Sequence, residues 1–149
     1  MKNILFIAIT MFFITGCVTY QYNTTGSPEN KDNTIVINTD KSDEQNYNDF
    51  GRYLISKGFT FENKDKEFKT YVTRPRTVSG QMQYKLSVTC ISSNIQVRAE
   101  LTTITFGSYD VIWVNWKYRN DVGNIHLKAF KTFFPILYEY SNNISFIVN

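Results

Sequence analysis

A long stretch in the middle of the chain, residues 82–101, alternates between apolar and polar side chains. Apolar residues take even positions up to Cys90 and odd positions from Ile95, and the polar segment Ser92–Asn94 separates the two runs. A period of two is typical of a strand with one buried face, because successive side chains point to opposite sides of a sheet. A change of parity across a short polar turn indicates an antiparallel hairpin. The stretch therefore predicts two long antiparallel strands with one buried and one solvent-exposed face.

A helix is predicted from about Asp43 to Lys57. Ser42 and Gln45 have the spacing of a capping box at its start. Gly58 follows its end, where a left-handed residue usually terminates a helix. Apolar residues recur at helical spacing between these signals, which indicates that one face is buried. These residues are Tyr47, Phe50 and Leu54.

Shorter alternating segments predict further strands on both sides of the hairpin. Residues 59–61 and 68–73 form one pair, with Phe68 and Val72 as the apolar members of the second strand and Pro75 as its end. Residues 112–118 continue the alternation after the hairpin, with Ile112, Val114, Trp116 and Tyr118 on the buried side. Residues 35–37 and 144–148 are expected to add a short edge strand and a last short strand.

A second helix is predicted over about 124–140, where apolar residues again follow helical spacing. Pro135 is expected to kink or split this helix near Phe134, because proline removes a backbone hydrogen bond. Together the segments predict an α+β fold. Its expected architecture is an antiparallel sheet of four to five strands with two helices packed on one face.

The N-terminus has the pattern of an export signal. Lys2 precedes the apolar run 4–14, which is too short to span a bilayer as a stable helix. The tetrapeptide Ile14-Thr15-Gly16-Cys17 resembles the lipobox of bacterial lipoproteins. The resemblance implies that Cys17 receives a diacylglyceryl group and that the peptide is cut after Gly16. An ordinary secretory signal with an incidental cysteine is the alternative.

This reading divides the chain into three parts. Residues 1–16 are the expected lipoprotein signal peptide, residues 17–33 the lipidated cysteine with a flexible tether, and residues 34–149 a single α+β domain. The hydrophobic set makes up 42% of the chain and charged residues 19%, which excludes a disordered protein. Val18, rather than an aspartate, follows Cys17. In lipoproteins of two-membrane bacteria this implies the periplasmic leaflet of the outer membrane.

Part of the folded domain also resembles a known group of proteins. The helix, the pair Gly58-Phe59, a short strand with Glu62 and the strand 70–73 are similar to the opening of small domains of outer-membrane assembly lipoproteins. The resemblance covers about 30 residues. It implies binding to other envelope proteins without catalysis.

The chain offers few groups for chemistry. His126 is its single histidine, and Cys90 has no partner in the chain once Cys17 carries lipid. We find no ligand spacing typical of a metal site and no nucleophile elbow or phosphate-binding loop, so we expect no metal, no cofactor and no catalytic residue. The net charge of +3 is too small to indicate a nucleic-acid partner.

The solvent-exposed face of the predicted sheet offers a better candidate for function. Aromatic residues and arginine are enriched where proteins dock. The candidate binding residues on this face and on the segment that follows the hairpin are Lys85, Arg98, Tyr109, Trp113 and Arg119. A merely solvated face is the alternative reading.

The function expected from these features is that of a membrane-anchored lipoprotein. Lipid on Cys17 would hold it to the membrane, and its domain would bind an envelope protein or polymer without catalysis. Two other classes of function remain open. One is a carrier of an apolar ligand between sheet and helices, and the other is an envelope hydrolase whose site has no recognisable motif.

The lipobox generates a direct test. Cys17→Ser should abolish lipid attachment and leave an uncleaved precursor, because the thiol is the acceptor of the lipid. Metabolic labelling with a fatty-acid probe measures the attachment. Continued labelling of the variant would show that the lipobox interpretation is wrong.

Overall fold

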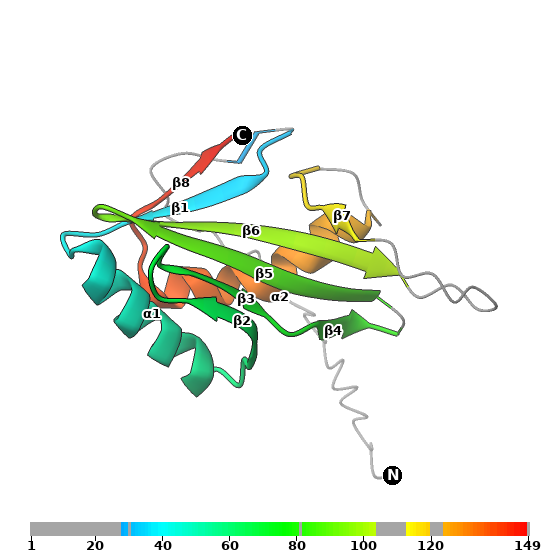
Figure 1. Ribbon diagram of the computed structural model, residues 1–149. Helices are drawn as coiled ribbons and strands as arrows, with labels where there is room; N and C mark the ends of the chain where they lie inside the picture. Colours follow the sequence, from blue (N-terminus) through cyan, green and yellow to red (C-terminus); the bar gives the residue numbers. More distant parts are fainter. Residues whose placement is uncertain (1–27, 30, 81, 104–112, 120–123, 149) are drawn as a thin grey trace, which may run out of the picture.

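The computed structural model describes residues 28, 29, 31–80, 82–103, 113–119 and 124–148. These residues form an α+β domain with two helices and a mixed-length antiparallel sheet (Figure 1). The elements in chain order are β1 (Thr34–Asn38), α1 (Asp43–Ser56), β2 (Phe61–Asp65), β3 (Thr70–Thr73), β4 (Arg76–Ser79), β5 (Met82–Ile91), β6 (Asn94–Thr103), β7 (Val114–Asn115), α2 (Ile125–Tyr140) and β8 (Ile144–Ile147).

The predicted hairpin is confirmed as the centre of the sheet. β5 and β6 pair along their whole length from Met82↔Thr103 to Ile91↔Asn94, with a turn at Ser92 and Ser93. The strand order is β2-β3-β5-β6-β1-β8, with β4 also paired to β5 and β7 also paired to β6. The side chains expected on the buried face, from Tyr84 to Leu101, are buried.

The expectation of four to five strands is wrong, because the described residues form eight. β5 and β6 have ten residues each, whereas their neighbours have two to five. Each long strand therefore has room for two short neighbours along one edge. β3 and β4 share the free edge of β5, and β1 and β7 share that of β6. β1 is also not at the edge, since β8 pairs with its outer side.

Two of the shorter strands differ from the sequence-based assignment. In β3 it is Tyr71 that is buried, whereas Phe68 precedes the strand and is 69% exposed. Tyr71 is paired with Val88, which faces the core, so the register of β3 on β5 places Tyr71 inside. The segment after the hairpin buries Trp116 as expected, but β7 is only two residues long and Val114 is 44% exposed.

Both ends of α1 match the sequence signals. The Ser42 amide donates to Gln45 Oε1 at 3.1 Å, and the Gln45 amide donates to Ser42 Oγ at 3.3 Å, which completes the capping box. At the other end the Phe59 amide donates to the Leu54 carbonyl, and the Gly58 amide to the Ile55 carbonyl. This is a Schellman motif, and Gly58 takes the left-handed conformation that it requires (φ 79°).

α2 continues through Pro135 as one helix, so the expected split near Phe134 does not occur. Proline removes one amide, and the carbonyl without a partner is that of Lys131, four residues earlier. Lys131 is an exposed residue of α2. No helix among the described residues is long and apolar enough to cross a membrane.

Both helices pack against the same face of the sheet and against each other. Phe133 of α2 lies over Tyr84 of β5 with ring centroids 5.7 Å apart, and Phe50 of α1 contacts Tyr140 at 4.8 Å. The Tyr53 hydroxyl of α1 donates to the Ile136 carbonyl of α2 at 2.6 Å. Aromatic rings thus occupy much of the layer between the sheet and the helices.

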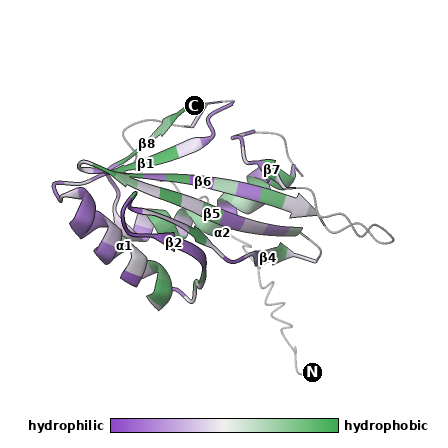
Figure 2. Ribbon diagram, in the orientation of Figure 1, coloured by the Kyte–Doolittle hydropathy of each residue, from purple (hydrophilic) through white to green (hydrophobic). Residues whose placement is uncertain are grey.

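β2, at one edge of the sheet, is largely hydrophilic (Figure 2), which disfavours pairing with another sheet.

The hydroxyls of buried Tyr71 and half-buried Tyr53 lead to different expectations for stability. Tyr71→Phe should leave the free energy of unfolding within about 0.5 kcal/mol of wild type or raise it, because this hydroxyl is buried without a hydrogen-bond partner among the described residues. Tyr53→Phe should lower it by about 1 kcal/mol, because it removes the bond to Ile136. Denaturant unfolding measures both. A larger loss for Tyr71→Phe would contradict the environment described for its hydroxyl.

Candidate binding surface

The face of the sheet that the helices leave uncovered carries a compact group of charged and aromatic side chains. Lys85 of β5 and Glu100 of β6 are register partners, and their side chains form an ion pair at 3.1 Å. The Lys85 ammonium also lies 4.8 Å from the centroid of the Trp113 ring, just before β7. The Lys85 and Glu100 side chains are only 18% and 31% exposed, so the three residues form one packed cluster.

Arg98 lies next to this cluster on β6, at the gap between β1 and β7. Its Nε donates to Thr34 Oγ1 at 3.1 Å, which holds the guanidinium beside the first residue of β1. A small cavity of about 70 Å³ occupies the gap, lined by Asn33, Arg98, Ala99 and Asn115. The gap exists because β1 and β7 each pair with only part of β6.

The other candidate residues lie elsewhere. Arg119 is exposed near the first turn of α2, where it and Lys117 lower the pKa of His126. Tyr109 and the lipidation residue Cys17 lie outside the described residues. The structure thus brings Lys85 and Trp113 together, places Arg98 beside them and puts Arg119 at a different corner.

A polar notch lies at the end of β1 that is formed by Asn38, away from Thr34 and Arg98. It is an open cavity of about 450 Å³ between the β1–α1 connection and the α2–β8 connection. Its lining residues all carry polar groups, and Tyr140 contributes the only aromatic ring among them. The lining residues are Asn38, Thr39, Asp40, Lys41, Tyr140, Ser141 and Asn143. The Lys41 ammonium forms an ion pair with Asp49 of α1 at 2.8 Å, so the positive charge of this lining residue is already neutralised.

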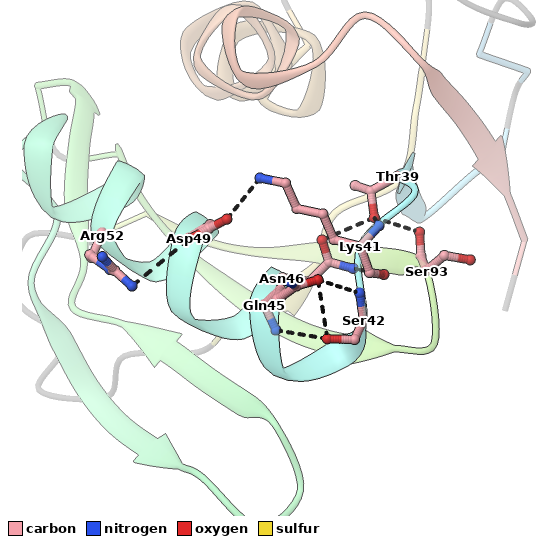
Figure 3. A network of polar contacts seen from close by, with 8 residues as sticks. All are labelled: Thr39, Lys41, Ser42, Gln45, Asn46, Asp49, Arg52 and Ser93. Atoms are coloured by element: carbon pink, nitrogen blue, oxygen red, sulfur yellow. Dashed lines mark hydrogen bonds and ion pairs between the residues drawn. The ribbon is translucent and has the colours of Figure 1, made fainter.

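Beside the notch, a hydrogen-bond network joins α1 to the turn of the central hairpin (Figure 3). Asn46 is fully buried, and its Nδ2 donates to the carbonyls of Lys41 and Ser92 at 3.3 and 3.4 Å. The Thr39 hydroxyl lies 3.0 Å from Asn46 Oδ1 and 2.9 Å from the Ser93 carbonyl. Sequence reasoning missed Asn46, because a polar residue inside a helix is normally solvated and its partner Ser92 is distant in the chain.

The two groups best suited to chemistry lie apart. Burial raises the pKa of the Cys90 thiol to about 12, which keeps it protonated and unreactive. The pKa of His126 is lowered by burial and by Arg119 and Lys117, and His126 Nδ1 accepts a hydrogen bond from the Lys117 amide at 3.2 Å. Within the described ranges, no group of three His, Cys, Asp or Glu residues could hold a metal ion.

The buried amide generates a stability prediction. Asn46→Ala should lower the free energy of unfolding by about 2 kcal/mol, because it removes the buried amide that donates to the carbonyls of Lys41 and Ser92. Asn48→Ala is the matched control on the same helix. Its side chain bonds only Glu44 and is half-exposed, so the loss should stay below about 0.5 kcal/mol. Equal losses in denaturant unfolding would show that Asn46 does not tie the helix to the hairpin.

Comparisons of the chain with protein-family models, with curated proteins and with solved structures find no match. What the domain does therefore has to follow from its own residues.

Proposed function

We propose that this chain is a bacterial lipoprotein, anchored by lipid on Cys17 to the periplasmic leaflet of the outer membrane. Its α+β domain binds an envelope protein or polymer through the uncovered face of the sheet and performs no chemistry. The observation that carries the binding surface is the packed cluster of Lys85, Glu100 and Trp113 on that face. The anchor is supported by the lipobox residues of the sequence.

The cluster suits a docking surface for a physical reason. A flexible lysine loses side-chain entropy when a partner immobilises it. Lys85 already lies between the Glu100 carboxylate and the Trp113 ring, so part of that cost is met before binding. The cluster also combines a cation, an anion and an aromatic ring, which provides both polar and apolar contacts.

The arrangement gives less support to the two other classes of function. A hydrolase would need a nucleophile beside a base, whereas Cys90 lies in the core at the end of β5 and His126 lies on the first turn of α2. A carrier of apolar ligands would need space between sheet and helices. That layer is filled by rings such as Trp116 and Phe130, stacked at 5.5 Å, which a ligand would have to displace.

A photocrosslinking experiment in the native envelope tests the surface. The residue Gln96 on the uncovered face of β6 is replaced by p-benzoylphenylalanine, and Arg52 on the exposed side of α1 serves as the matched control. We expect a crosslinked adduct from position 96 and none from position 52. Adding Trp113→Ala should reduce the yield of the adduct, because truncating a central aromatic contact typically costs about 2 kcal/mol of binding.

Two outcomes would contradict the proposal. An adduct from position 52 alone would move the binding surface to α1. An adduct whose yield is unchanged by Trp113→Ala would show that the cluster does not contribute to docking.

A further inference from the structure

Four exposed cations gather where the chain enters the domain. The Lys31 amide donates to the Tyr118 carbonyl at 3.2 Å, and the Tyr118 amide donates to the Asp32 carbonyl at 2.7 Å. This pairing places Lys31 beside the segment 116–119. We call the four residues the basic entrance; they are Lys31, Arg98, Lys117 and Arg119.

The remaining contacts hold this group in place. The Trp116 amide donates to the Ala99 carbonyl at 2.7 Å, which lays the segment along β6 next to Arg98. The Trp116 and Tyr118 rings both contact Phe130 of α2, at 5.5 and 5.3 Å. With these two rings turned toward the core, the intervening Lys117 and the following Arg119 are left exposed.

The basic entrance carries an excess of positive charge. Among the described residues that precede β1, the acids are Glu29 and Asp32. The Asp32 side chain is nearly buried, and its carboxylate accepts a hydrogen bond from the Glu29 amide at 2.7 Å. The influence of Lys117 and Arg119 on the pKa of His126 agrees with their proximity. Mutual repulsion of exposed cations is unfavourable by itself, and an anionic surface would relieve it.

The opposite end of β1 leads into α1 (Figure 1). The β1–α1 connection and the first half of α1 contain four acids. These are Asp40, Asp43, Glu44 and Asp49. The Thr39 amide donates to the Ser93 carbonyl there, so this acidic end coincides with the turn of the central hairpin. The domain is therefore basic where the chain enters. At the far end of β1 the acids are partly neutralised, because Asp49 pairs with Lys41 and Glu44 with Lys69.

We propose that the basic entrance docks on the anionic phospholipid headgroups of the membrane that holds the anchor. The proposal rests on the lipid anchor of the proposed function. Thirteen residues lie between Cys17 and Lys31, a flexible span of roughly 20 Å. Lipid on Cys17 would thus keep the basic entrance close to the headgroups, where even weak attraction to anionic lipid is effective.

Docking would also orient the domain. With the basic entrance on the bilayer, the acidic end and the hairpin turn at Ser92 and Ser93 point away from it. Lys85 lies on β5 and Trp113 just before β7. Both belong to the partner surface rather than to the basic entrance.

Amide hydrogen exchange of the mature, full-length protein in lipid nanodiscs tests the docking. One set of discs contains phosphatidylcholine alone and the other contains phosphatidylglycerol as well. We expect residues 31–34 and 116–119 to exchange at least about threefold more slowly in the anionic discs, and the turn at 91–94 to exchange equally in both. Salt at about 1 M, where the screening length is about 3 Å, should remove the difference. Equal exchange in both discs would overturn the proposal.

Two charge-reversal variants test whether the lipid-dependent protection requires the residues of the basic entrance or only the net charge of the protein. The first combines Lys31→Glu, Lys117→Glu and Arg119→Glu, and it should lose the lipid-dependent protection. The matched control reverses three exposed cations elsewhere and should keep it; its substitutions are Arg52→Glu, Lys66→Glu and Arg74→Glu. Circular dichroism checks that both variants fold. The comparison of the wild-type protein between the two kinds of disc does not depend on either variant. Equal behaviour of the two variants would overturn the site.

The intact mass of the purified protein separates failure of the anchor from failure of the docking. An unmodified Cys17 would refute the lipid anchor. The same exchange experiment would then be made with free vesicles of both compositions, and slower exchange with anionic vesicles alone would still support the basic entrance. Slower exchange with soluble polyglutamate, but not with phosphatidylglycerol, would assign the basic entrance to an acidic protein and overturn membrane docking.

Discussion

The β5–β6 hairpin is the element on which the rest of the domain depends, because its apolar face has to be covered by the other elements. Its inward residues are almost completely buried, and two helices are needed to cover them. Each strand is also longer than any outer neighbour, so the backbone groups of its outer edge need two partners. The four strands that flank the hairpin and the single-sided helix layer follow from these two requirements, and β2 and β8 extend the sheet beyond β3 and β1.

The two ends of β1 differ in how polar groups are used. At the hairpin turn, buried Asn46 donates to the Ser92 carbonyl, and the Thr39 hydroxyl and amide both contact the Ser93 carbonyl. At the chain entry, Lys117 and Arg119 remain exposed around a segment fixed by backbone bonds and aromatic contacts. The first arrangement contributes to stability, whereas the second places positively charged side chains at the surface.

The proposed anchor, basic entrance and partner surface form a consistent arrangement. A tether of limited length would bring the chain entry near the bilayer, and the entry is the basic end of the domain. The uncovered face of the sheet, with Lys85 and Trp113, extends from there and stays accessible to an envelope partner. Membrane docking and partner binding would then use different residues of neighbouring surfaces.

Sequence by itself determined the features that depend on local periodicity and on residues close in the chain. These include the hairpin and its buried face, both ends of α1, the existence of α2 and the α+β class. Tertiary structure alone decided which short strands fill the edges of β5 and β6, why Tyr71 rather than Phe68 is buried, and that Asn46 meets Ser92. It also brought Lys31 beside Lys117 and Arg119. The reason is physical: every residue other than proline offers the same backbone donor and acceptor, so local pattern specifies a strand but not its partner or register.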